Sequence, residues 1–93
     1  MRTIERQAAF RRDFKREKLP GRYKKFDQTI VDILTLLATD SPLPERYSDH
    51  PLMGNWVGFR ECHIKPDLLL IYEKPDSDTL VLARLGSHSE LFG

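Results

Sequence analysis

Three histidines are the residues of this chain best suited to chemistry, and all of them lie in its second half. His50, His63 and His88 share that half with Asp67 and Arg84. A histidine can take up and release a proton near neutral pH, so three of them near a carboxylate and a basic residue suggest acid–base catalysis. We therefore predict that the second half of the chain carries proton-transfer chemistry.

Short strands must position these residues. The alternation of apolar and polar positions and the turn residues between them predict three consecutive strands. Their expected ranges are Trp56–Ile64, Asp67–Glu73 and Thr79–Leu85. Such strands form an antiparallel meander, in which His63 and Asp67 flank one turn and are expected almost opposite each other. Arg84 and His88 come from the end of the adjoining strand, and His50 enters from the preceding loop. We expect one cluster on an open face or edge of the sheet.

The first half of the chain predicts helices. Phe10 and Phe14 lie one turn apart in a helix expected over Ala8–Leu19, which Pro20 and Gly21 end. A second helix, expected over Tyr23–Ala38, has apolar residues at helical spacing along its length. A weak strand signal precedes both helices at positions 2–6. The predicted fold class is α+β, with an antiparallel helical hairpin packed on one face of a small twisted antiparallel sheet.

The length and composition predict one domain over residues 1–93. A chain of 93 residues with 40% hydrophobic content is large enough for one core and too small for two. Cys62 is the only cysteine, so no intramolecular disulfide can form, and a reducing cytoplasm is the expected compartment. The charged N-terminus does not resemble a signal peptide, and the longest apolar stretch, Leu68–Tyr72, is too short to cross a membrane.

The net charge of +1 hides an uneven distribution along the chain. Residues 1–25 hold ten Lys or Arg and three acidic residues, whereas residues 26–93 hold five and eleven. The first segment therefore carries a charge of about +7 and the second about −6. A basic segment can bind phosphates, because neutralising them releases condensed counterions. It can equally be a solvated helix face or a site for an acidic protein, so the charge alone does not decide between these alternatives.

A set of motifs in the second half resembles the YafQ branch of the RelE/ParE toxin superfamily. The matching pieces are His50-Pro51-Leu52, Gly54 with Trp56, Gly58-Phe59-Arg60, His63 with Pro66-Asp67, Leu70-Ile71-Tyr72, Gly86, His88 and Leu91-Phe92-Gly93. Their order and spacing carry the resemblance, which is densest over residues 43–93 and extends across the domain. One position departs from the family pattern, because Leu68 stands where a tryptophan is expected.

The resemblance implies the toxin of a type II toxin–antitoxin pair, an endoribonuclease that cuts mRNA in the ribosomal decoding site and inhibits translation. It also implies a small twisted sheet with two helices against it, in agreement with the pattern above. The residues that match active-site positions of the family are His50, His63, Asp67, Arg84, His88 and Phe92. Many RelE relatives lack such histidines, so the histidine set places this chain near the YafQ branch.

The chemistry of RNA cleavage explains this residue set. Attack of a ribose 2′-hydroxyl on the neighbouring phosphate needs a base, an acid and positive charge facing the phosphorane. Arg84 is the expected charge donor, since a guanidinium matches phosphate geometry, and His88 is the expected acid or base. Asp67 and His63 are expected to form a coupled pair, with His50 on the opposite side. Phe92 is expected to stack on a base, or else to pack against the protein. Outside this set, Trp56 and Arg60 are interpreted as structural, with Trp56 in the core and Arg60 paired with a carboxylate, and RNA contact is the alternative for either.

Two other functions are open to these residues. His50, His63, His88 and Asp67 could bind zinc, but their spacing matches no short paired-ligand motif, so we expect no metal and no cofactor. A non-nucleolytic toxin of the ParE kind, which poisons DNA gyrase, is the second alternative. It would not need these histidines, and we favour the endoribonuclease.

The resemblance also implies partners. They are a cognate DinJ-like antitoxin, the ribosome with its mRNA, and promoter DNA bound only through the antitoxin complex, with no membrane. The basic segment is the expected ribosome-docking surface, and the residues chosen there as RNA-binding are Lys15, Arg16, Lys24 and Lys25. Codon preference and the assignment of acid and base remain open.

Overall fold

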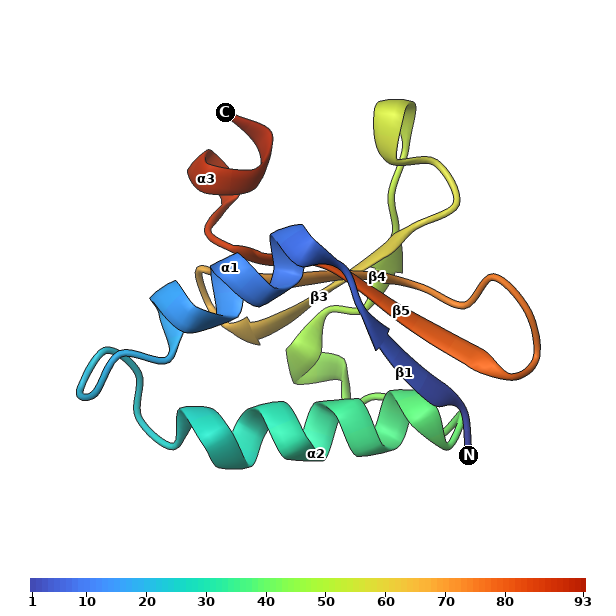
Figure 1. Cartoon of the computed structure of the whole chain (residues 1–93), viewed down its shortest axis with the longest axis horizontal. Helices are drawn as coiled ribbons and strands as arrows, with labels where there is room; N and C mark the ends of the chain where they lie inside the picture. Colours follow the sequence, from blue (N-terminus) through green and yellow to red (C-terminus); the bar gives the residue numbers. More distant parts are fainter.

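The computed structural model describes residues 1–93 as a five-stranded sheet with helices on both of its faces (Figure 1). The strands are β1 (Thr3–Arg6), β2 (His50–Pro51), β3 (Arg60–Lys65), β4 (Leu68–Glu73) and β5 (Thr79–Gly86). The helices are α1 (Ala8–Glu17), α2 (Phe26–Ala38) and α3 (His88–Phe92), with two short 3-10 helices, η1 (Glu45–Tyr47) and η2 (Gly54–Trp56). The predicted α+β class, a helical hairpin on a small sheet, is confirmed.

The sheet is mixed rather than wholly antiparallel. Its order is β1-β5-β4-β3-β2, and every pair is antiparallel except β1 with β5, which is parallel. The predicted meander β3-β4-β5 is present. The parallel pair consists of β1 and β5, which are the first and the last strands of the chain. The long connection between them, which begins with α1, allows the two strands to run in the same direction, whereas a tight turn would make them antiparallel.

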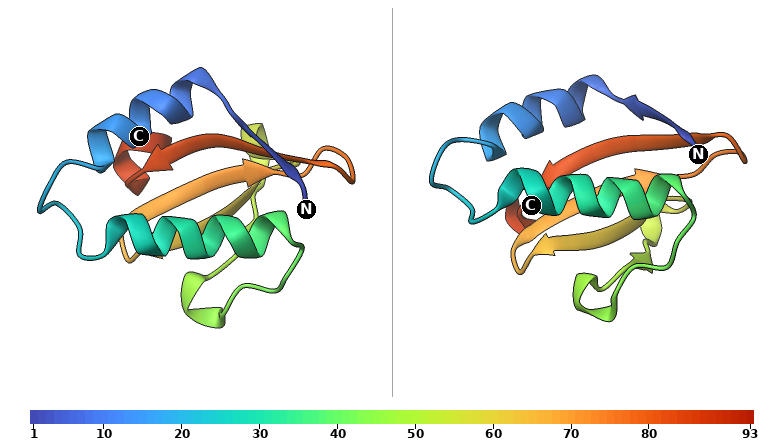
Figure 2. Two further views of the ribbon diagram at one scale, coloured as in Figure 1. Left: turned by 60° about the horizontal axis from the view of Figure 1, so that its bottom comes forward. Right: turned by 90° about the horizontal axis from the view of Figure 1, so that it is seen from below.

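Helix α2 covers one face of the sheet and α1 packs along β5, as both views of Figure 2 show. The two helices contribute apolar side chains at helical spacing to the main core, which they form with the sheet. The buried helix residues of this core are Phe10, Phe26, Ile30, Ile33, Leu37 and Ala38. The expected helix positions are therefore confirmed, although α1 ends at Glu17 and α2 begins only at Phe26.

A smaller apolar cluster lies on the opposite face of the sheet. It consists of Leu69, Ile71, Ala83 and Leu91, with the partly buried Leu52, Trp56 and Phe59 packed against it. Because both of its faces are covered, five of the six residues of the central strand β4 are buried, which explains its continuous apolar run. This second face also carries the histidines described below.

Two segments on that face differ from the sequence prediction. The strand expected from Trp56 begins only at Arg60, because Gly54–Trp56 form the 3-10 turn η2. The segment after β5, expected as a tail, forms the helix α3. Its start is a capping box, in which the Ser87 hydroxyl accepts from the Glu90 N–H and the Glu90 carboxylate accepts from the Ser87 N–H. The Ser-x-x-Glu spacing could have predicted this helix.

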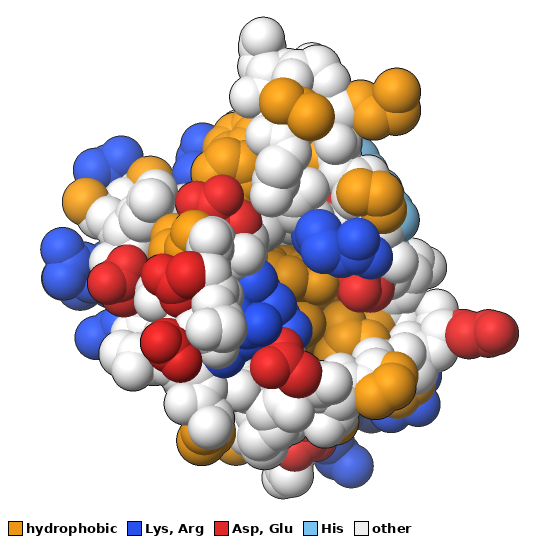
Figure 3. All heavy atoms as spheres, turned by 90° about the vertical axis from the view of Figure 1, so that its right-hand side faces the viewer, with side chains coloured by type: hydrophobic (Ala, Val, Ile, Leu, Met, Phe, Trp, Pro, Cys, Tyr) orange, Lys and Arg blue, Asp and Glu red, His pale blue; other side chains and the backbone are white.

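Surface charges are mixed on the face that lies at the right-hand side of Figure 1. Figure 3 shows acidic and basic side chains interspersed there, with histidine visible at one edge. None of the helices has both the length and the apolar character that a membrane span requires.

Candidate active site

A buried glutamate joins two of the three histidines. Glu61 of β3 is almost fully buried, and its Oε2 lies 2.9 Å from Nε2 of His50 and 3.3 Å from Nε2 of His63. One carboxylate oxygen therefore orients two imidazoles. The contact with His50 is a hydrogen bond, and the Nδ1 atom of the same ring lies 3.2 Å from the Pro51 carbonyl, whereas the contact with His63 is a charge contact.

The sheet register explains this meeting. Glu61 and His63 are two residues apart on β3, so their side chains share a face, and His50 on β2 pairs directly with Glu61. Glu61 is not among the residues predicted from the sequence. The Glu-x-His spacing within a predicted strand was the available signal, because it places the carboxylate on the same face as the histidine.

The loop that carries His50 is held by its neighbour Asp49. The Tyr72 hydroxyl donates to Oδ1 of Asp49 at 2.5 Å, and Nη2 of Arg60 lies 3.2 Å from Oδ2 of the same carboxylate. Burial, together with the bond to Asp49, raises the pKa of Tyr72, so the hydroxyl remains a donor at neutral pH. The expected pairing of Arg60 with a carboxylate is confirmed, and it indirectly fixes the start of β2.

His88 completes the cluster from the start of α3. Its ring centroid is 5.7 Å from that of His63, in an edge-to-face arrangement, and the ring centroids of His50 and His63 are 6.4 Å apart. His88 is exposed, and its Nδ1 lies 3.6 Å from Oδ1 of Asp67, a charge contact too long for a hydrogen bond. The structure thus brings together all three histidines that the sequence singled out.

The expected pairing of His63 with Asp67 is wrong. His63 pairs across the hairpin with Leu69, and a bulge follows between His63 and Lys65, so Asp67 falls in the turn itself. Asp67 faces His88 instead, and Glu61 takes the place beside His63. The neighbouring Leu68, at the position where the family pattern has tryptophan, is fully buried in the main core.

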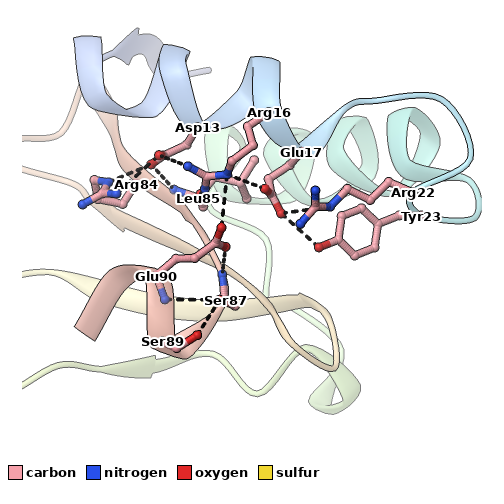
Figure 4. A network of polar contacts seen from close by, with 10 residues as sticks. All are labelled: Asp13, Arg16, Glu17, Arg22, Tyr23, Arg84, Leu85, Ser87, Ser89 and Glu90. Carbon is pink, nitrogen blue, oxygen red and sulfur yellow. Dashed lines mark hydrogen bonds and ion pairs between the residues drawn. The ribbon is translucent and has the colours of Figure 1, made fainter. Parts of the chain in front are cut away.

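Arg84 shares a row of the sheet with His50 but does not contact the histidines. The register pairs Arg84 with Ile71, Ile71 with Glu61, and Glu61 with His50. The Arg84 guanidinium is bound by Asp13 of α1, with Nε 2.7 Å from Oδ2 and Nη2 3.3 Å from Oδ1 (Figure 4). Its Nη1 has no protein partner and is the donor left for a ligand.

Asp13 is a buried carboxylate with two kinds of donor. Besides Arg84, the Leu85 N–H donates to its Oδ2 at 3.0 Å. Burial by itself would raise the pKa of Asp13, but the hydrogen bonds from Arg84 and Leu85 outweigh it and lower that pKa below its ordinary value. Asp13 is therefore ionised at neutral pH and holds the end of β5 against α1.

Aromatic side chains continue from the histidines. The Phe92 ring centroid is 6.1 Å from that of His88 and 6.4 Å from that of Trp56, and Trp56 packs edge to face on Phe59 at 5.3 Å. Phe92 is 44% exposed, so part of its ring is free to contact a ligand. Trp56 contacts the small core, in agreement with its expected structural role.

The four basic residues chosen from the first half divide into two groups. Lys15, Lys24 and Lys25 are exposed, and no carboxylate lies within 4.0 Å of their ammonium groups. Arg16 differs from the expectation, because Asp13, Glu17 and Glu90 surround its guanidinium, which is therefore not free for a phosphate.

A groove of about 660 Å³ lies beside Asp67, between the α1–α2 loop and the start of α3. Its lining residues include Arg22, Lys24, Lys65, Asp67, Ser87 and Ser89. Three cationic side chains thus lie along a channel that begins next to the residues around His88. This arrangement suits a linear anionic ligand that continues past the histidine cluster.

Three ligand atoms of the cluster are also close enough for a metal ion. One atom each from His50, Glu61 and His63 lies within 4.8 Å of the others. Two imidazoles and a carboxylate are a donor set that suits divalent first-row metals. This set differs from the four ligands considered from the sequence, since Glu61 replaces Asp67 and His88 lies outside it.

Comparison with known proteins matches the whole chain to one family. A family model described as a bacterial toxin of a type II toxin-antitoxin system, YafQ, matches residues 2–93. The mRNA interferase toxin YafQ of Escherichia coli is 39% identical over 93 residues, covering 99% of this chain and 97% of that protein.

Solved structures agree with this match. A copper-bound mutant toxin from Helicobacter pylori is 41% identical, with a TM-score of 0.89 over 99% of this chain and 100% of that one. The toxin in the DinJ-YafQ complex of Escherichia coli is 37% identical, with a TM-score of 0.84 over 100% of both chains. The fold and the sequence are therefore similar to those of the same group of toxins.

Proposed function

Since this chain belongs to the YafQ family of bacterial toxins from type II toxin–antitoxin systems, we propose that it is an endoribonuclease that cleaves mRNA in the ribosomal decoding site and inhibits translation. The similar toxin from Escherichia coli is named an mRNA interferase. The observation that carries the proposal is the meeting of His63 and His88, each beside its own carboxylate.

The two histidines provide a base and an acid within reach of one phosphodiester. Nε2 of His63 lies 3.3 Å from the carboxylate of the buried Glu61, so in this assignment Nε2 carries the hydrogen and the Nδ1 lone pair accepts the proton of the ribose 2′-hydroxyl. His88, beside Asp67, then donates a proton to the 5′-oxygen that leaves. In this assignment a bond forms between O2′ and phosphorus, the P–O5′ bond breaks, and the products are a 2′,3′-cyclic phosphate and a 5′-hydroxyl.

His50 and Arg84 support the same reaction in different ways. His50 shares the Glu61 carboxylate with His63 and borders the site on the β2 side. Arg84 faces the phosphorane with its free Nη1, while Asp13 holds the rest of its guanidinium. One such donor typically contributes on the order of 3 kcal/mol to the stabilisation of a transition state.

The substrate is held by stacking and by charge. The exposed part of the Phe92 ring stacks on an unpaired base, since an aromatic face accepts any nucleotide. The groove with Lys24 and Lys65 takes the phosphates of the strand as it continues. Lys15, Lys24 and Lys25 form the ribosome-docking surface, where they contact ribosomal RNA.

Regulation follows from the family. The similar Escherichia coli toxin forms a complex with DinJ, so we infer that a DinJ-like antitoxin binds and restrains this toxin. The complex acts on promoter DNA through the antitoxin.

A metal ion at His50, Glu61 and His63 is a second candidate role for the cluster. It is favoured by the spacing of the three ligand atoms and by the copper-bound state of the similar toxin from Helicobacter pylori. These residues fit Cu²⁺ or Zn²⁺, and the ion would occupy the imidazoles that the proton-transfer mechanism uses. Isothermal titration of the protein with Cu²⁺, beside Glu61→Gln, tests this role, and equal affinity of the two proteins would exclude it.

Message-end mapping tests the proposed function. The wild type, His88→Gln and Arg84→Gln are induced in cells, and mRNA 5′ ends are mapped within minutes. We expect new ends at defined codons with the wild type alone, together with arrest of translation. Purified ribosomes programmed with a defined mRNA then test ribosome dependence, because naked mRNA should remain uncut.

The alternative function gives a different result in the same cells. A ParE-like toxin that poisons DNA gyrase would leave mRNA ends unchanged and would produce DNA breaks and an SOS response. Activity that persists in EDTA, in protein shown to be free of metal, would separate proton transfer by histidines from a metal-dependent reaction.

A further inference from the structure

The short helix α3 carries two side chains of the proposed site, His88 and Phe92, but its own attachment to the sheet is slight. Only Leu91 among its five residues is buried. The capping box stabilises the first turn and acts within the helix, so it does not set the direction of the helix relative to the sheet. Because a helix this short is marginal by itself, the position of His88 depends on contacts from other elements.

Glu90 makes such a contact, because its carboxylate reaches α1 (Figure 4). Its Oε2 lies 3.3 Å from Nε of Arg16, and its Oε1 accepts a hydrogen bond from the Ser87 N–H at 2.9 Å. That hydrogen bond lowers the pKa of Glu90, so the side chain is charged at neutral pH. One carboxylate thus joins the cap of α3 to a helix far away in the sequence.

Arg16 is itself held from three other directions. Its Nε donates to Oε2 of the buried Glu17 at 2.7 Å, its Nη1 to Asp13 at 3.2 Å, and its Nη2 to the Leu85 carbonyl at 3.0 Å. The bond to Glu17 raises the pKa of Arg16, so its charge is permanent. The single Nε hydrogen goes to Glu17, so the contact with Glu90 is an ion pair, and the three hydrogen bonds fix the position of the positive charge that attracts Glu90.

Gly86 leaves the space that this arrangement needs. A Cβ at this position would lie 3.0 Å from Nη2 of Arg16 and 3.1 Å from Oε1 of Glu90. Its backbone is not in the left-handed region, so the reason for glycine is the close approach of the ion pair. The end of β5, the guanidinium and the cap of α3 are therefore packed directly on one another.

We propose that Arg16 is a positioning residue, whose guanidinium fixes α3 through Glu90 and so holds His88 beside His63 and Phe92 beside His88. This inference rests on the proposed ribonuclease function of the histidine cluster. It gives Arg16 a role different from that of the exposed lysines of the same basic segment, which face solvent and are free to contact phosphates.

The same contacts also affect stability, so the test needs more than one substitution. Three carboxylates surround Arg16, and of the two arginines beside the buried Glu17, Arg16 is the nearer, at 2.7 Å against 3.8 Å for Arg22. Arg16→Gln therefore combines a stability effect with the positioning effect. Glu90→Gln removes only the charged contact from α3 to Arg16 of α1, keeps an oxygen for the Ser87 N–H, and changes a side chain that is one-third exposed.

The experiment compares the wild type with Arg16→Gln, Arg16→Lys, Glu90→Gln and the matched control Arg6→Gln, whose arginine is exposed at the end of β1. Cleavage of a defined mRNA on purified ribosomes gives kcat and KM at a temperature well below every unfolding midpoint. Imidazole and amide NMR resonances of the free toxin report the positions of His88 and Phe92.

We expect Arg16→Gln and Glu90→Gln to lower kcat by roughly 10- to 100-fold, because a displacement of about 1 Å at a catalytic group is enough for such a loss. KM should change by less than about threefold, which separates positioning from an RNA contact. The resonances of α3 should shift or broaden while those of β1 stay in place, and Arg16→Lys should recover part of kcat. Arg6→Gln should behave as the wild type.

Two results would overturn the proposal. One is a folded Glu90→Gln with wild-type kcat and unchanged His88 resonances. The other is an increase in KM alone for Arg16→Gln, which would make Arg16 an RNA contact. If the wild type itself does not cleave mRNA, the proposed function fails, and the NMR arm still decides whether Arg16 positions α3.

Discussion

The rings of His63 and His88 meet edge to face, with centroids 5.7 Å apart, although one belongs to the inner strand β3 and the other to the last helix of the chain. Each ring has its own carboxylate, since Glu61 contacts His63 and Asp67 lies beside His88. The proposed proton transfers therefore use two separate acid–base pairs, which face each other across the space for one phosphodiester.

Substitution of either histidine should remove most of the activity. His63→Gln and His88→Gln should each lower kcat for mRNA cleavage by about 10²- to 10⁴-fold, because each loses one proton transfer. The loss of kcat in the double variant should be much smaller than the product of the two single losses, since the two groups act as a unit. Single-turnover cleavage of mRNA on programmed ribosomes measures these rates. If the loss in the double variant equalled the product of the single losses, the two histidines would not act together in one reaction.

Glu61→Gln should reduce catalysis without unfolding the protein. The amide keeps the size of the side chain but removes the negative charge that lies beside both imidazoles, so His63 loses its electrostatic partner. We expect a loss in kcat of up to about 10⁴-fold, by analogy with the carboxylate that orients the histidine of a Ser-His-Asp triad. Circular dichroism monitors folding, and Glu5→Gln, at an exposed position of β1, is the matched control. Wild-type kcat in the folded variant would exclude an orienting role.

Phe92→Ala should weaken substrate binding more than catalysis. Loss of one stacked base costs about 1–3 kcal/mol, which corresponds to an increase of roughly 5- to 150-fold in KM. Phe92→Tyr keeps the ring and should bind nearly as the wild type does. Equal KM values for the alanine and tyrosine variants would instead assign Phe92 to packing against Trp56 and His88.

Asp13→Asn should destabilise the fold in a pH-dependent manner. Loss of the charged hydrogen bonds to Arg84 and Leu85 should lower the free energy of unfolding by about 2 kcal/mol at pH 7. Because the folded pKa of Asp13 lies below its unfolded value, this stabilisation is fully present above about pH 4 and is lost as the pH falls through the folded pKa.

Urea unfolding at pH 7 and at pH 2.5 measures that difference. The free energy of unfolding of Asp13→Asn should be lower than that of the wild type at pH 7, and this difference should shrink at pH 2.5. The exposed control Asp32→Asn should have nearly the free energy of unfolding of the wild type at either pH. If Asp13→Asn lost the same free energy of unfolding at both pH values, the contribution of Asp13 to stability would come from packing and not from its charge.

The sequence predicted the local elements well, because their signals are local. Periodic apolar residues predicted α1 and α2, and an apolar run bounded by turns predicted the central strand β4. The family motifs identified the three histidines, which lie together in the structure. The start of β3 and the helix α3 were missed, because the turn at Gly54 and the capping box at Ser87 were not recognised.

Pairings between distant segments could not be predicted in the same way. A single bulge between His63 and Lys65 moved Asp67 out of register with His63, and no pattern in one strand specifies such a shift. The parallel entry of β1 depends on which edge of the sheet remains free after the other strands have paired.

The sequence by itself therefore determined the chemistry available to this protein: three imidazoles, the acidic and basic groups near them, and the elements that carry them. Only the tertiary structure decided which carboxylate belongs to which histidine, and that Asp13 and Glu90 engage Arg84 and Arg16. The physical reason is that helix and strand periodicity is encoded by neighbouring residues, whereas these contacts depend on strand register and on the packing of α1 against β5 and α3.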